Sequence, residues 1–230
     1  TNWFRRCVNN NDYFRVSDIF ASHRYFSLTE RDLSTLFFTE RMEILSTRQP
    51  TKSFVVAEFG FQDHRSTSVL NPLMRNYPYA VWSTAFAIQG LNLGTSGFSI
   101  WCLHDTLYPG NNRMEYGLWD GKSEDWKERP VYYAWEMFCR LTQKGSTVWK
   151  CTSSHKDSVE AVRVDDVLFW VNQNEHPVTV VVSNFPTDRT YAFTEEFITG
   201  PSKRKYDRLH VKEGKFAAPA MSFGYARKAR

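Results

Sequence analysis

Residues 53–60 read Ser53-Phe54-Val55-Val56-Ala57-Glu58-Phe59-Gly60, an apolar run that leads into a carboxylate and a glycine. The run is typical of a strand in a parallel sheet, because such a strand is covered on both faces and shows no polar alternation. Because Gly60 lets the backbone turn, we expect the strand to end here and to leave Glu58 at its C-terminal rim. Barrels and open α/β sheets place their chemistry at that rim. Taken alone, the run also fits a structural Glu58 held in a salt bridge.

Two further strands and three helices are expected around this run. Thr29 to Asp32 is a capping-box pattern that begins a helix, and Pro130 suits the first turn of another helix. His23 and Tyr25 end the strand before the first helix and, two residues apart, point to the same side. The order strand, helix, strand, helix, strand, helix is the repeat of a parallel α/β architecture. The expected strands are 18–25, 53–58 and 97–103, and the expected helices are 29–46, 79–91 and 131–142.

After Gly145 the pattern changes to short strands with alternating polarity. Asp165-Asp166 is expected to form a tight turn between two of them. Short strands at this spacing are typical of an antiparallel sandwich or barrel. We therefore divide the chain into an α/β part, residues 1–145, and a β-domain, residues 146–230. The expected strands of the β-domain are 147–151, 159–164, 167–171, 178–183, 191–197, 206–211 and 221–225.

The composition is ordinary for a soluble globular protein, except that aromatic residues are abundant. Hydrophobic residues make up 42% of the chain, charged residues 23% and aromatic residues 16%, with a net charge of +4. Flat rings stack on the apolar faces of sugars, although they also fill β-rich cores. The basic residues form no stripe, so we expect no nucleic-acid partner. No apolar run has the length of a membrane span and no signal-peptide pattern opens the chain, so we expect no membrane association.

The cysteine pattern argues against a metal centre. Cys7, Cys102, Cys139 and Cys151 do not have metal-ligand spacing, and we expect no metal and no cofactor. Because Cys102 lies in an expected buried strand and Cys139 on an expected helix, free buried thiols are the expected state. The cysteines leave the compartment open between an exported and a cytoplasmic location.

The order of the motifs resembles the C-terminal part of a clan A retaining glycoside hydrolase, with glycoside hydrolase family 39 the nearest in character. This resemblance implies the last part of a (β/α)8 TIM barrel, strands six to eight, followed by a small antiparallel β-sandwich. It covers nearly the whole chain. The matching segments are Ser22-His23-Arg24-Tyr25 for strand six, Val56-Ala57-Glu58-Phe59-Gly60 for strand seven, Gly97-Phe98-Ser99-Ile100-Trp101 for strand eight, and 116–119 with 129–134 for the approach to helix eight.

The resemblance implies a retaining double-displacement mechanism on the O-glycosidic bonds of oligo- or polysaccharides. Glu58 takes the position of the nucleophile. The family's acid/base lies on strand four, usually as Asn-Glu, and these residues contain no strand four. Asn174-Glu175 matches this dipeptide but falls in the β-domain. The expected partners are therefore a carbohydrate substrate and a missing N-terminal barrel segment, without which the chain is not expected to turn over substrate.

The substrate-binding candidates are His23, Tyr25, Trp101, His104 and Asp105. The resemblance implies that Trp101 forms an apolar platform under the sugar and that His23 or Tyr25 donates a hydrogen bond to Glu58. His104 and Asp105 could bind sugar hydroxyls, or could be ordinary loop residues. The other tryptophans are expected to serve packing, and they are Trp119, Trp126, Trp135, Trp149 and Trp170.

Two other functions fit some of the same residues. The chain could be a non-catalytic carbohydrate-binding or scaffold remnant, with Glu58 a structural carboxylate. A nucleic-acid-binding α/β protein rests on the mild positive charge alone. An upstream strand with Asn-Glu in the same polypeptide or complex would separate an enzyme from a remnant.

Overall fold

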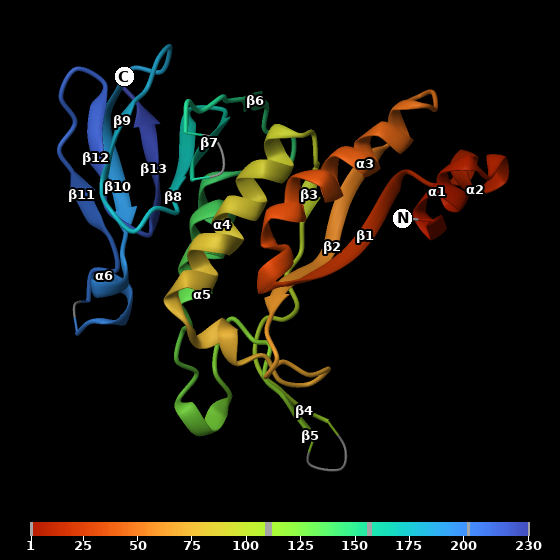
Figure 1. Cartoon of the computed structure of the whole chain (residues 1–230), viewed down its shortest axis with the longest axis horizontal. Helices are drawn as coiled ribbons and strands as arrows, with labels where there is room; N and C mark the ends of the chain where they lie inside the picture. Colours follow the sequence, from red (N-terminus) through yellow and green to blue (C-terminus); the bar gives the residue numbers. More distant parts are fainter. Residues whose placement is uncertain (1, 109–111, 156–157, 202, 230) are drawn as a thin grey trace.

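A three-stranded parallel sheet forms the first part of the structure, as predicted. The computed structural model describes residues 2–108, 112–155, 158–201 and 203–229. The strands are β1 (Ile19–Ser27), β2 (Ser53–Gln62) and β3 (Gly97–Phe98), side by side in the order β1-β2-β3 and parallel throughout (Figure 1). The two crossovers between neighbouring strands carry helices, which is the βαβ arrangement.

Two expectations about these strands were wrong. Strand β2 does not end at Gly60 but continues to Gln62, paired with β1 over its whole length. Strand β3 is only two residues long, and the segment after Phe98 is irregular rather than a buried strand to Leu103. The apolar residues of that segment lie in a loop. Among the described residues, its backbone forms hydrogen bonds with residues 116–119 and not with strand β2 beyond Ser99.

Three long helices follow the strands, as predicted. Both α4 and α5 begin with a proline in the first turn, where its missing N–H has no intrahelical partner to lose. A 3-10 helix, Leu28–Leu33, precedes α3, and the backbone N–H of Ser27 donates to the Glu30 carboxylate. The capping residue is therefore Ser27 and not Thr29. The helices are α1 (Asn2–Asn9), α2 (Asn11–Val16), α3 (Ser34–Ser46), α4 (Tyr77–Asn92) and α5 (Pro130–Leu141).

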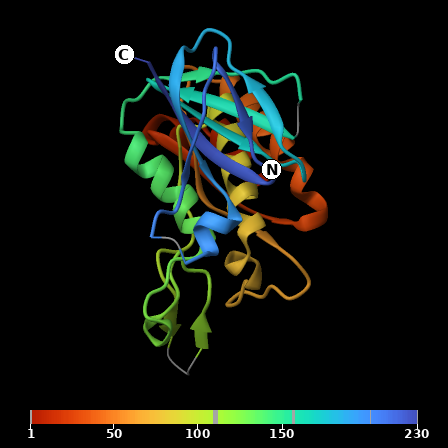
Figure 2. The ribbon, with the colours of Figure 1, turned by 90° about the vertical axis from the view of Figure 1, so that its left-hand side faces the viewer.

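Helix α4 is the centre of the core. Its residues are apolar or small almost all round, as expected for a helix that is covered on every side. On one side the Phe86 ring stacks on Phe59 of β2, with centroids 4.3 Å apart. On the other side α4 contacts strands of the antiparallel sheet, which cross in front of it in Figure 2. The helices thus form a layer between two sheets.

The last part of the chain forms a six-stranded antiparallel sheet. Its order is β11-β10-β13-β8-β7-β6, and β9 pairs with β12 in a separate two-stranded sheet. The Trp170 side chain of β8 packs on Phe216 of β12, whereas the neighbouring Phe169 packs on Phe138 of α5. The strands are β6 (Val148–Lys150), β7 (Val159–Val164), β8 (Val167–Asn172), β9 (Val178–Val181), β10 (Thr187–Phe193), β11 (Asp207–Leu209), β12 (Lys215–Ala218) and β13 (Ser222–Lys228).

The sequence pattern misplaced one strand here and missed another. Strand β10 ends at Phe193, and residues Glu195–Thr199 form helix α6, where a strand to 197 was expected. Strand β12 was not predicted. One apolar cluster runs from the parallel sheet through α4 and α5 into β8 and β13. The division at residue 145 therefore stays a prediction.

The cysteines are free, as predicted, but they are not fully buried. Cys7, Cys102 and Cys151 are half-buried, and Cys139 on α5 is exposed. Within the described ranges no helix is long and apolar enough to cross a membrane.

The antiparallel sheet yields a stability prediction at Gly224 of β13. A Cβ atom there would overlap the Tyr191 carbonyl oxygen and lie 2.6 Å from Trp170 Cζ2. We expect Gly224→Ala to lower the free energy of unfolding by about 3 kcal/mol in urea titrations. Gly97→Ala is the control, because its Cβ would meet only Val55 Cγ1 at 3.7 Å and should change stability by less than about 1 kcal/mol. Equal effects of the two changes would contradict this packing.

Candidate active site

A β-bulge places Glu58 on the face of the sheet opposite the helices. The pairing of β2 with β1 skips Ala57, so Ser22 pairs with Val56 and His23 with Glu58. Before the bulge Phe54 and Val56 face the core, and after it Phe59 and Phe61 do. By strand alternation the Glu58 side chain points to the opposite face, where 26% of it is exposed.

Two side chains of β1 converge on one oxygen of Glu58. The Tyr25 hydroxyl donates a hydrogen bond to Glu58 Oε2 at 3.3 Å, and His23 Nδ1 lies 3.4 Å from the same oxygen. Burial, followed by the charge of Glu58, raises the pKa of Tyr25 well above its ordinary value of 10.0. The phenol therefore keeps its proton and acts as a donor. The structure brings these three of the predicted residues together.

The position of the Tyr25 ring depends on residues that were not predicted as part of the site. Gly60 lies beside it, and a Cβ atom there would be 3.0 Å from Tyr25 Cε1 and 2.6 Å from Tyr79 Oη. Tyr116 meets the Tyr25 ring edge to face, with centroids 6.1 Å apart. The Tyr116 hydroxyl accepts from Gln62 Nε2 at 2.9 Å. Gln62 shares the face of Glu58 because it lies four residues further along β2, which is the one signal that could have found it.

Trp101 lies on the irregular segment after β3 and not on a strand. Its side chain is 39% exposed, and its Nε1–H donates to Met114 Sδ at 3.0 Å. The next residue, Cys102, is tied to the site by its N–H, which donates to the Tyr116 carbonyl at 2.9 Å. Burial raises the pKa of Cys102 to about 11, so its thiol is not a ready nucleophile.

His104 and Asp105 are adjacent but have different environments. His104 is exposed, and its ring stands perpendicular to Trp126 with centroids 5.4 Å apart. The Asp105 side chain is only 1% exposed and is bound by Arg129 Nη2 at 2.7 Å and by the Gly117 N–H at 3.0 Å. The expectation that Asp105 binds sugar hydroxyls was therefore wrong, because its carboxylate is enclosed by structural donors.

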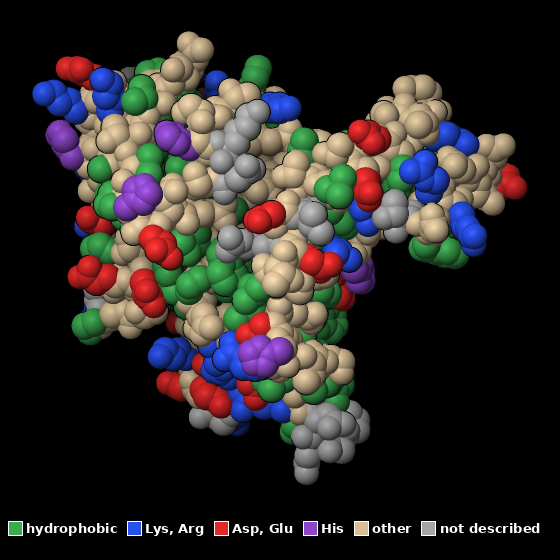
Figure 3. Space-filling model, in the orientation of Figure 1, with side chains coloured by type: hydrophobic (Ala, Val, Ile, Leu, Met, Phe, Trp, Pro, Cys, Tyr) green, Lys and Arg blue, Asp and Glu red, His purple; other side chains and the backbone are tan. Residues whose placement is uncertain are grey.

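Asp105 belongs to an ion-pair network that fixes the loops before α5. The buried Arg129 also contacts Asp120 and donates to the Gly117 carbonyl at 2.7 Å. Arg113 joins Asp105 to Glu124, with Nη2 distances of 3.2 and 2.7 Å. Figure 3 shows acidic and basic side chains gathered at the lower end of the molecule, over these loops.

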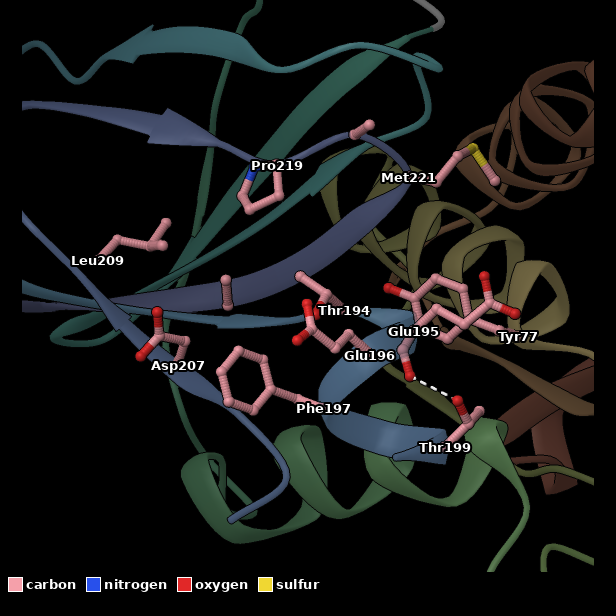
Figure 4. Close-up of a pocket in the computed structure, with 12 residues that line it drawn as sticks. Tyr77, Thr194, Glu195, Glu196, Phe197, Thr199, Asp207, Leu209, Pro219 and Met221 are labelled. Atoms are coloured by element: carbon pink, nitrogen blue, oxygen red, sulfur yellow. Dashed lines mark hydrogen bonds between the residues drawn. The ribbon is translucent and has the colours of Figure 1, made fainter. Parts of the chain in front are cut away.

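A separate cleft lies where α6 meets the antiparallel sheet. It measures about 720 Å³ and contains none of the predicted site residues. In Figure 4 the Phe197 ring and the carboxylates of Glu196 and Asp207 line it, and the Thr199 hydroxyl donates to the Glu195 carbonyl at 2.8 Å. Across the described part of the chain no three His, Cys, Asp or Glu side chains gather as a metal ion would need.

Comparison of the whole fold with solved structures finds glycoside hydrolases that have TIM-barrel folds. A family 30 endoxylanase from Clostridium papyrosolvens C71 shares 15% identity over 97% of this chain and 52% of its own, with a TM-score of 0.63. A family 51 α-L-arabinofuranosidase, AbfB, from Bifidobacterium longum shares 13% identity over 99% and 56%, with a TM-score of 0.67. An α-L-arabinofuranosidase from Thermotoga maritima shares 10% identity over 98% and 55%, with a TM-score of 0.66.

These comparisons establish a likeness of fold. The chain spans about half the length of the structures that it resembles. No protein-family model and no curated protein sequence matches it. The glycoside hydrolase-like fold expected from the sequence is present, whereas the narrower resemblance to family 39 stays a prediction.

The Tyr25–Glu58 contact predicts a pH dependence that can be measured on the chain itself. A tyrosine whose pKa is raised on folding contributes stability below its unfolded pKa, near 10.0, and loses that contribution as the pH rises further. We therefore expect the unfolding free energy to fall more steeply above pH 10 in the wild type than in Tyr25→Phe. Glu58→Gln should give an intermediate slope, because it removes the charge but not the burial. Three equal slopes in urea titrations at pH 8 to 11 would contradict the contact.

The ion-pair network predicts a large loss of stability at Arg129. Arg129→Met leaves the buried Asp105 without its main partner, so we expect a loss of about 3–5 kcal/mol in urea unfolding. Arg189→Met is the matched control, because the Arg189–Asp188 pair is exposed and should contribute less than about 1 kcal/mol. A loss at Arg129 no larger than at Arg189 would show that the network does not hold these loops.

Proposed function

We propose that the chain is the C-terminal portion of a retaining glycoside hydrolase and that Glu58 is its nucleophile. The observation that carries the proposal is the convergence of Tyr25 and His23 on one oxygen of a carboxylate that faces away from the core. A purely structural carboxylate would more often be enclosed, as Asp105 is. The fold shared with TIM-barrel glycoside hydrolases supports the same reading.

The contacts suggest a role for each atom in the first step. Because Tyr25 and His23 hold Oε2, we assign Oε1 of Glu58 to attack the anomeric carbon. The new Oε1–carbon bond gives a glycosyl-enzyme, and the bond from that carbon to the leaving oxygen breaks. A second carboxylic acid gives its proton to the leaving oxygen. In the second step the same group, now a base, takes a proton from the water that releases the sugar.

The second carboxyl group is proposed to come from outside these residues. Retaining enzymes hold the two carboxyl groups about 5–5.5 Å apart. Among the described residues, the hydrogen bonds and ion pairs of Glu58 join it to Tyr25 and His23 and to no acid. Asn174-Glu175 lies in the connection between β8 and β9, and the Asn174 side chain donates to Asn172 Oδ1. It is therefore not proposed for this role.

A missing barrel segment is the proposed partner. Strand β1 forms one edge of the parallel sheet in the described structure, so its outer backbone groups are available to another strand. A cleft of about 410 Å³ follows this edge, lined by Trp3, Phe4, residues 21–24 and Arg41. A further parallel strand on this edge would continue the barrel and bring its own C-terminal rim beside Glu58.

The finer architecture and the substrate belong to the same proposal. Residues 1–145 supply barrel strands six to eight, with β1, β2 and β3 in those places. Residues 146–230 supply a β-sandwich in which the six-stranded sheet faces β9 and β12. The substrate is an oligo- or polysaccharide, and Trp101 and His104 are proposed to contact it from the rim. A non-catalytic remnant of such a barrel is the second candidate, favoured by the single carboxylate in the cluster.

The test uses a polypeptide that carries this chain within a complete barrel. Glu58→Gln should fold normally and lose several orders of magnitude in turnover of an aryl glycoside, because an amide is too weak a nucleophile. Azide should restore activity to Glu58→Ala and give the product of inverted configuration, since a small anion can enter the vacated space. Glu43→Gln, an exposed change on α3, is the control and should leave turnover unchanged. A stable, fully active Glu58→Gln protein would reject the proposal and favour the remnant.

A further inference from the structure

Trp126 is a large apolar side chain that packing does not require. It was expected to serve packing, yet 48% of it is exposed, whereas Trp135 and Trp170 are buried. Trp126 and the exposed His104 ring that packs against it form one surface patch, and exposed rings of this kind are common in binding surfaces.

The backbone under Trp126 is also unusual. Asp125 and Trp126 both have left-handed conformations, with φ of 54° and 55°. For a bulky side chain this conformation is an outlier that persists only where the surrounding structure enforces it. Here the turn is closed by the Trp126 N–H, which donates to the Gly121 carbonyl at 3.4 Å, and by the Asp120 N–H, which donates to Lys127. The surrounding hydrogen bonds thus hold Trp126 in an unfavourable backbone conformation while its indole is exposed to solvent.

The Trp126 ring is held in a fixed orientation. Glu124, in the same turn, accepts two hydrogen bonds from Arg113, which also contacts Asp105. His104, the neighbour of Asp105, places its ring at 87° to the indole and is itself fixed by its Nδ1 contact of 2.7 Å with the Asp105 carbonyl. A ring that meets the indole edge to face leaves much of the indole accessible, in agreement with its exposure.

This ring is connected to the Glu58 cluster by a short series of contacts. Tyr25 touches Glu58, Tyr116 touches Tyr25, and the Tyr116 carbonyl accepts from the Cys102 N–H. Two residues beyond Cys102 is His104, against Trp126. Tyr25 and Glu58 lie in the C-terminal halves of β1 and β2, and the segment with Cys102, His104, Tyr116 and Trp126 follows β3, so the patch is on the side of the parallel sheet where the strands end.

We infer that Trp126 and His104 form a second sugar-binding platform, separate from the place of bond cleavage, which takes another unit of an extended oligosaccharide. The inference rests on the proposed function. An open indole face suits the C–H face of a pyranose or furanose ring. The His104 imidazole that contacts the indole, and the exposed lysines of the same segment, Lys122 and Lys127, are polar groups that can bond to its hydroxyls. Affinity should therefore rise with the length of the sugar chain.

The test measures binding of sugars to the 230-residue chain by isothermal titration calorimetry. Xylohexaose, cellohexaose and arabinohexaose are compared with the corresponding disaccharides. We expect at least one hexasaccharide to bind at least tenfold more tightly than its disaccharide. Trp126→Gly should remove that gain without disturbing the turn, because glycine accepts the positive φ. Trp126→Phe should keep part of it, since a flat ring remains.

The matched control is Trp149→Ala, which removes a tryptophan that is 53% exposed on β6 of the antiparallel sheet. It should bind every sugar as the wild type does. The inference is overturned if none of the three hexasaccharides binds, or if Trp126→Gly binds as tightly as Trp149→Ala. It is also overturned if sedimentation shows a dimer that Trp126→Gly abolishes, because a second copy would then occupy the patch.

The two proposals fail in distinguishable ways. Binding that depends on Trp126, together with a fully active Glu58→Gln enzyme, would reject Glu58 as the nucleophile and keep the platform. Binding that does not depend on Trp126, together with an inactive Glu58→Gln enzyme, would reject the platform alone.

Discussion

One extra residue in β2, the bulge at Ala57, allows the same strand to supply both the core and the candidate site. A strand alternates its side chains, so a regular strand with Phe54 and Val56 in the core would also turn Glu58 inward. The bulge at Ala57 changes the alternation by one position. Glu58 is thereby moved to the open face while Phe59 and Phe61 stay against the helices. Both the packing of α4 and the Glu58 cluster depend on that single change of register.

The order of the strands and helices could be predicted, because it depends on patterns within short windows. Strand β7, Val159–Val164, was predicted with its observed bounds from its alternation alone. The bulge could not be predicted, since Ala57 is apolar and fits either register. The loop after Phe98 was mistaken for a strand because its apolar letters, Ile100 to Leu103, resemble one. Its path is set by backbone bonds to residues 116–119, which no local pattern reveals.

The candidate site was predictable only where it lies on strands. His23 and Tyr25 meet Glu58 because strand pairing is regular and their spacing of two keeps them on one face. Asp105 was misjudged because its neighbours in space, Arg113 and Arg129, lie 8 and 24 residues away along the chain. The sequence of a loop does not reveal whether a polar residue in it is solvated or paired with an arginine. Trp126 was misjudged in the opposite direction, since composition alone favours a buried tryptophan.

The enclosed position of α4 has a consequence for how the protein is made. The helix is complete at Asn92, yet one of its covering contacts is between Tyr77 and Phe223 of β13. During synthesis its apolar surface therefore stays without that cover until the ribosome has produced roughly 130 further residues. Such delayed, long-range contacts slow folding and leave an aggregation-prone nascent chain. A molecular chaperone that shields apolar helices would therefore have a target in α4 until β13 has been made.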